Sequence, residues 1–134
     1  MAASKYDFSI EQGSSFKMTM IYKDANGVAI NLTGWCARIV WTTNLNQVQV
    51  FSTQNIDYSV YKFTIDGADG KLTFMLPSTT TNGFGFSTAR YDLELQSPDD
   101  LYSGGGNFTS RILYGTISIS KRYSKSNTEL DCGL

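Results

Sequence analysis

Apolar and polar residues alternate along most of this chain, which is the pattern of β-strands that are half buried against a core. Residues 90–96 show it most clearly, because Tyr91, Leu93 and Leu95 fall on one side of an extended chain and the charged side chains fall on the other. The same alternation predicts further strands over residues 16–23, 35–41, 48–51, 58–65, 71–76 and 108–120. Helical periodicity is not evident in any segment. We therefore expect an all-β protein of about seven short strands.

Turn signals separate these predicted strands. The pair Asn26-Gly27 tolerates positive φ angles and predicts a tight turn, while Pro77 ends the strand over 71–76 because it has no backbone N–H. Residues 78–88 are expected to form a long polar loop that carries two aromatic residues, and residues 98–106 a flexible connection. Turns at this spacing favour an antiparallel sandwich or barrel.

Length and composition narrow the picture further. A chain of 134 residues has room for one core of ordinary size, and no internal repeat or boundary divides it. The formal net charge of -1 gives no general attraction to nucleic acid or to an anionic membrane. The chain contains no histidine, so the usual general base at neutral pH and the commonest zinc ligand are missing. We expect no nucleic-acid partner, no membrane partner and no enzymatic activity.

The remaining polar clusters have simpler interpretations than catalysis. Asp57, Asp66 and Asp69 lack the regular spacing of a calcium loop, so their expected role is in tight turns. The adjacent Asp99 and Asp100 would diverge in an extended chain and do not form an acid/base pair. We expect no catalytic residue, no cofactor and no metal ion.

Two cysteines are too few for a disulfide framework. Cys36 lies in a predicted strand, where it is most simply a small buried residue, and Cys132 lies in the C-terminal tail, as the third residue from its end. A link between the two is disfavoured because one is in a strand and the other in a tail.

Five segments, in a fixed order along the chain, carry a resemblance to a known family. They are Tyr6-Asp-Phe-Ser-Ile-Glu-Gln-Gly13, Tyr22-Lys-Asp-Ala-Asn-Gly-Val-Ala-Ile-Asn-Leu-Thr-Gly-Trp35, Ala37-Arg38, Tyr91-Asp-Leu-Glu-Leu95 and Leu113-Tyr-Gly-Thr-Ile-Ser-Ile119. In this pattern the chain resembles a group of small bacteriophage virion proteins with immunoglobulin-like sandwiches. The match extends over most of residues 6–120.

The resemblance implies an antiparallel immunoglobulin-like β-sandwich with a C-terminal extension. Residues 1–5 would then be an N-terminal arm, residues 6–120 the sandwich and residues 121–134 a C-terminal arm. Tyr91, at the start of a late strand, would either form the tyrosine-corner hydrogen bond of such sandwiches or simply pack in its strand.

The function implied is that of a non-enzymatic structural subunit of a phage tail, baseplate or neck, located in the virion after assembly in the host bacterial cytoplasm. Its partners would be copies of itself and neighbouring virion proteins. An alternative is a decoration module, or one that binds the host surface or a glycan. A carboxylate-only enzyme remains a formal third possibility, for which no converging pair of acids can be placed.

Candidate contact residues follow from aromatic and apolar side chains outside the predicted strands and from the arms. Large apolar side chains in glycine-flanked loops either contact another chain or pack within their own loop. The candidates are Phe84, Phe86, Tyr102, Tyr123, Leu130 and Cys132.

Overall fold

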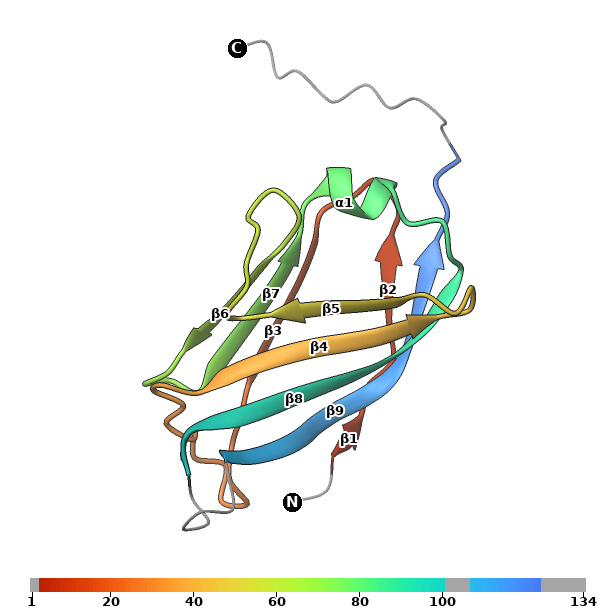
Figure 1. Cartoon of the computed structure of the whole chain (residues 1–134). Helices are drawn as coiled ribbons and strands as arrows, with labels where there is room; N and C mark the ends of the chain where they lie inside the picture. The colour runs from red at the N-terminus through yellow and green to blue at the C-terminus, as the bar shows by residue number, and fades with distance from the viewer. Residues whose placement is uncertain (1–2, 101–106, 124–134) are drawn as a thin grey trace.

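The computed structural model describes residues 3–100 and 107–123, and it is a sandwich of two β-sheets with one short helix (Figure 1). The chain is all-β, as the alternating pattern predicts. The elements are β1 (Ser4–Lys5), β2 (Phe8–Glu11), β3 (Phe16–Ile21), β4 (Cys36–Thr43), β5 (Val48–Ser52), β6 (Lys62–Asp66), β7 (Lys71–Leu76), α1 (Ser78–Asn82), β8 (Thr88–Asp100) and β9 (Asn107–Ser120).

The larger sheet has the order β1-β9-β8-β4-β5, with β2 also paired to β9, and the smaller sheet has the order β3-β7-β6. Most neighbours are antiparallel, but β1 and β2 run parallel to β9. The expectation of a purely antiparallel sandwich is therefore wrong for the N-terminal strands. Strands β1 and β2 account for the difference from the expected seven, because both are too short to show a clear alternation.

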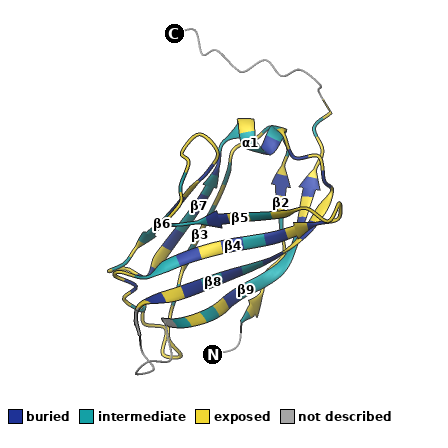
Figure 2. Ribbon diagram, viewed as in Figure 1, coloured by how far each residue is buried: buried dark blue, intermediate teal, exposed yellow. Residues whose placement is uncertain are grey.

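Burial follows the alternation in the central strands (Figure 2). In β4, Ala37, Ile39 and Trp41 are buried while the residues between them are exposed or half buried. Strand β4 lies between β8 and β5, as its two partly apolar faces predict. In β8, Tyr91, Leu93 and Leu95 face the core.

Strand β9 departs from a simple alternation. Its register against β8 shifts between Leu93 and Glu94, where Leu93 pairs with Leu113 but Glu94 pairs with Arg111. The extra residue at this bulge is Ile112, which is buried. Leu113 pairs with Leu93 and is half buried against the core, on the same face as Ile117, as the sequence pattern predicts, and the bulge adds Ile112 as a buried residue that the pattern does not predict.

Aromatic rings from both sheets meet in the core. Trp41 of the larger sheet packs edge-on against Phe74 of the smaller one, with ring centroids 6.5 Å apart, and Phe74 also contacts Phe51 at 5.3 Å. Trp41 is completely buried, and its indole N–H donates a 2.6 Å hydrogen bond to the side-chain oxygen of Gln49. The one polar group of the Trp41 side chain is therefore hydrogen-bonded although the ring is buried.

The N-terminal segment is held against β9 and β8. The Tyr91 hydroxyl donates a 2.5 Å hydrogen bond to the carbonyl of Tyr6, and Asp7 accepts a hydrogen bond from the backbone N–H of Thr116. A tyrosine corner instead binds the backbone a few residues upstream. That alternative for Tyr91 is wrong, because its bond reaches the segment between β1 and β2.

The boundaries of the two predicted arms also differ from expectation. Residues 4 and 5 pair with β9. At the other end, the Lys121 side chain donates to the carbonyl of Phe86 at 2.8 Å, and the Arg122 backbone N–H donates to the Gln12 side chain at 3.0 Å. The folded unit thus includes residues from both predicted arms. Residues 78–82, expected to be loop, form one turn of helix instead.

Replacing Tyr91 by Phe should lower the free energy of unfolding by about 1 to 2 kcal/mol at pH 7, because the Tyr6 carbonyl loses its hydroxyl partner. Burial raises the pKa of Tyr91 far above its ordinary value of 10.0. Its contribution is therefore complete below about pH 10 and is lost as the pH rises toward the folded-state pKa, since only the unfolded chain ionises there. Urea titrations from pH 7 to 11 would measure this.

The difference in stability between the wild type and Tyr91→Phe should shrink above pH 10. A difference that stays constant or grows would contradict the raised pKa. Because the other tyrosines are common to both chains, the comparison isolates Tyr91.

Replacing Gly115 by Ala should destabilise the fold by about 2 to 4 kcal/mol, as expected for a steric clash at a packed backbone crossing. A Cβ there would overlap the Tyr6 carbonyl and lie 2.8 Å from the Asp7 carboxylate. Gly85→Ala is the matched control, because a Cβ at Gly85 meets nothing within 4 Å. Equal unfolding midpoints for both variants would contradict the close packing of this crossing.

Candidate interaction surface

The outer face of the larger sheet carries polar contacts between neighbouring strands. It is formed by the outward-pointing residues of β4, β5, β8 and β9, which alternate with the core residues (Figure 2). Two ion pairs cross it from strand to strand. Arg38 lies 3.3 Å from Glu94, and Arg111 lies 3.2 Å from Asp92. Opposite charges thus face each other across neighbouring strands.

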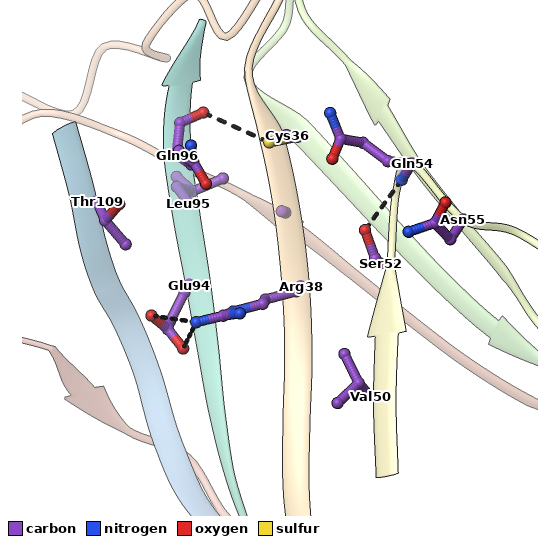
Figure 3. A pocket seen from close by; sticks show the side chains of 11 residues that line it. Cys36, Arg38, Val50, Ser52, Gln54, Asn55, Glu94, Leu95, Gln96 and Thr109 are labelled. Carbon is purple, nitrogen blue, oxygen red and sulfur yellow. Dashed lines mark hydrogen bonds and ion pairs between the residues drawn. The ribbon is translucent and has the colours of Figure 1, made fainter. Parts of the chain in front are cut away.

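A hollow of about 290 Å³ lies over β4, between β5 and β8 (Figure 3). Its floor carries the Arg38–Glu94 ion pair and the Cys36 thiol, which donates a 3.9 Å hydrogen bond to the carbonyl of Gln96. The residues that line it are Cys36, Ala37, Arg38, Val50, Ser52, Gln54, Asn55, Glu94, Leu95, Gln96 and Thr109. Amides, hydroxyls and one neutralised ion pair make this hollow polar with little net charge.

A second hollow of about 500 Å³ lies over β8 and β9 on the same face. Lys5, Arg90 and Arg111 border it together with Asp92, so positive charge exceeds negative charge there. Arg111 also lies over the ring of Tyr114, 4.9 Å from its centroid, in a cation–π contact.

The first hollow contains a potential nucleophile, the Cys36 thiol. The Cys36 thiol hydrogen-bonds to a backbone carbonyl, and no general base within the described residues is placed to activate it. Over residues 3–100 and 107–123, no three potential metal-binding side chains come together. In the same ranges, no helix is long and apolar enough to cross a membrane.

The aspartates considered for a calcium loop have local roles. Asp57 accepts hydrogen bonds from the hydroxyl of Ser59 at 2.6 Å and from its backbone N–H at 3.0 Å. These bonds lower the pKa of Asp57 below its ordinary value of 3.8. Asp66 lies at the end of β6, and Asp69 lies in the turn that follows. Asp57 thus shapes a turn, as the sequence predicts.

Two of the predicted contact residues are in the core. Phe84 and Phe86 are 5% and 2% exposed, and their rings pack against Trp41 at 5.9 and 6.3 Å. The expectation that both rings face another chain needs correction. The sequence shows that they lie between strands, but only the folded chain shows that α1 and the segment after it turn them inward.

The other predicted contact residues have different outcomes. Tyr123 is fully exposed, so its ring is available to a partner, and that contact stays a prediction. Tyr102, Leu130 and Cys132 lie outside the described residues. Cys36, interpreted from the sequence as a buried strand residue, is only half buried and lines the first hollow.

Sequence reasoning missed the exposed apolar side chains along β5 and the segments beside it. Val48 and Val50 point outward, and Leu45 and Tyr58 flank the strand with similarly exposed side chains. A signal for this was present, because no charged residue occurs between Arg38 and Asp57. An equally long uncharged stretch lies between Lys71 and Arg90, so this signal alone does not locate an exposed apolar face.

No protein-family model matches the chain, and no curated protein matches its sequence.

Replacing Phe86 by Ala should lower the free energy of unfolding by about 3 to 5 kcal/mol, because it leaves a cavity beside Trp41. Tyr123→Ala is the control for loss of an exposed ring and should change stability by less than about 0.5 kcal/mol. Urea unfolding of the two variants would measure the difference. Unchanged stability in Phe86→Ala would contradict its place in the core.

Proposed function

We propose that this protein is a non-enzymatic structural subunit of a bacteriophage virion, in the tail, baseplate or neck. The observation that carries the proposal is the role of the residues behind the family resemblance. In this chain they form turns and strand contacts rather than a reactive cleft. Structural roles of this kind fit a family whose members act by packing against other proteins.

The first segment of the resemblance ends in Gln12-Gly13. The Gln12 side chain donates to the carbonyl of Phe84 at 3.0 Å and accepts from the backbone of Arg122, which joins three distant parts of the chain. Gly13 has a φ angle of +84°. The roles of Gln12 and Gly13 are therefore structural.

The second segment forms two turns. Asp24 accepts hydrogen bonds from the backbone N–H groups of Asn26 and Val28, and Asn31 accepts one from Thr33. Leu32, which lies between Asn31 and Thr33, is completely buried. Asp and Asn side chains bind the backbone in this way in tight turns.

We also propose that the sandwich is immunoglobulin-like. In that class one sheet contains strands B, E and D and the other contains C, F and G, with C′ added in the variable type. Equating β3, β7 and β6 with B, E and D, and β5, β4, β8 and β9 with C′, C, F and G, reproduces the order in both sheets. A buried tryptophan on strand C is typical of the class, and Trp41 lies in β4.

A subunit of this kind would act by burying complementary surface against copies of itself and neighbouring virion proteins. Low charge suits that role, since charged residues make up only 17% of the chain and are costly to bury. The alternative of a host-surface or glycan-binding module would use Phe84, Phe86 and Tyr102. It has less support because the rings of Phe84 and Phe86 are enclosed in the core.

The proposal predicts that the protein is present at fixed stoichiometry in purified particles of the phage that encodes it. Quantitative mass spectrometry of particles from a density gradient would measure this against the major capsid protein. A phage with a stop codon early in this gene should yield incomplete particles, and supplying the wild-type chain in trans should restore them.

A non-virion phage protein that is abundant in the lysate serves as the control for contamination. Absence of the chain from intact infectious particles would overturn the proposal. Normal particle assembly without the gene, combined with loss of binding to host cells, would favour the host-surface alternative.

A further inference from the structure

Strand β5 forms an open edge of the larger sheet, since its only neighbour in the sheet order is β4. The hydrogen bonds at both ends of the β4–β5 ladder show which residues face β4. Thr43 donates its N–H to the carbonyl of Gln47, and Thr53 donates to that of Ala37. Backbone groups alternate in direction along an antiparallel strand. Val48, Val50 and Ser52 therefore direct their N–H and C=O groups away from the sheet.

The structure covers one part of this edge and leaves the other open. The Ser52 N–H donates to the Tyr61 hydroxyl at 3.2 Å, and that hydroxyl also lies against the carbonyl oxygens of Ser52 and Asn55. Val48 and Val50 have no such cover, and their outward backbone groups make no hydrogen bond within the described residues. The open part of the edge therefore centres on Gln49.

Charge distinguishes this edge from the others in the described chain. The remaining edge strands each carry charged residues, which discourage pairing with another strand. These are Lys5 in β1, Glu11 in β2, Lys17 in β3, and Lys62 and Asp66 in β6. Strand β5 has no charge, no proline and two outward valines that are 63% and 54% exposed.

We propose that β5 pairs antiparallel with β5 of a second copy of this chain, with Val48 of each copy opposite Val50 of the other. A twofold axis then passes beside Gln49. Because the two valines are the residues with free outward groups, this register satisfies the N–H and C=O of both in each copy. Their side chains meet across the seam on the outer face of the sheet, next to Val40, which is the β4 partner of Val50.

A second copy fits this edge better than the chain's own C-terminal segment. Residues 124–134 contain Lys125, Glu129 and Asp131 and no valine or isoleucine, so they are a poor strand to place against two valines. The contact is isologous and closed, as in most symmetric dimers. The proposal deepens the proposed function, on which it rests for taking copies of the chain as partners.

Strand β5 is short, and its length limits the expected affinity of the dimer. Pairing of five-residue strands with their flanking side chains buries on the order of 1,000 Å² in total, at the lower limit for specific interfaces. We therefore expect a dimer with a dissociation constant in the range of roughly 10 to 100 μM. A weak contact of this kind becomes effective when subunits are brought together in a larger assembly.

Sedimentation velocity of the full chain, from low micromolar to several hundred micromolar, tests the pairing. The wild type should change from monomer to dimer over this range, and Val50→Lys should raise the dissociation constant at least about tenfold, because it places a charge in the seam. Val50→Thr keeps the branched shape and the backbone groups and is the matched control. Circular dichroism would show that each variant is folded.

A cysteine scan tests the register directly in a Cys36→Ser, Cys132→Ser background. Gln49→Cys should form a disulfide-linked dimer on mild oxidation, because residues facing each other at the twofold axis have Cα atoms about 4.5 Å apart. Gln47→Cys is the positional control. In this register two copies of residue 47 lie roughly 13 Å apart, too far for a disulfide.

A monomer at every concentration would overturn the pairing, as would equal cross-linking of the two cysteine variants. Dimerisation that Val50→Lys does not affect would place the contact elsewhere. If a synthetic peptide of residues 124–134 dissociates the dimer at equimolar concentration, the terminal segment is the occupant instead. The detection of the chain in virions is a separate measurement, so failure of the pairing and failure of the proposed function can be told apart.

Discussion

The contact between Trp41 and Phe74 joins the two sheets, and the rest of the core is arranged around it. Phe51 of β5 in the larger sheet packs on Trp41, and so does Phe84 in the segment after α1. Cys36 is a free thiol, so no disulfide from it crosses between the sheets. Burial of large aromatic surfaces therefore takes the main part in holding the sandwich together.

The N-terminal strands depend on that core through Tyr91. Its ring lies in the core and contacts Phe8, while its hydroxyl binds the Tyr6 carbonyl. Gly115 allows the N-terminal segment to lie directly on β9, because any side chain there would overlap it. This crossing closes one side of the larger sheet with β1 and β2 and leaves β5 as its opposite edge.

The two edges of the larger sheet differ in what they offer a partner. The β1 and β2 edge carries charged residues, whereas the open half of β5 offers free backbone groups beside Val48 and Val50. Exposed uncharged strands are costly for a solitary protein because they promote association. A structural subunit uses the same property, which connects the proposed pairing to the proposed place in a virion.

Much of the fold was predictable from the sequence, because alternation in β4 and β8 depends only on local geometry and on the need to bury Ile39 or Leu93. The Asn26-Gly27 turn follows from local chemistry in the same way. Parallel pairing of β2 with β9, the bulge at Ile112 and the burial of Phe84 and Phe86 were decided only by the tertiary structure. Each depends on contacts between residues far apart in the chain, and so does the open edge of β5, which exists only because no other strand of the described fold pairs with it.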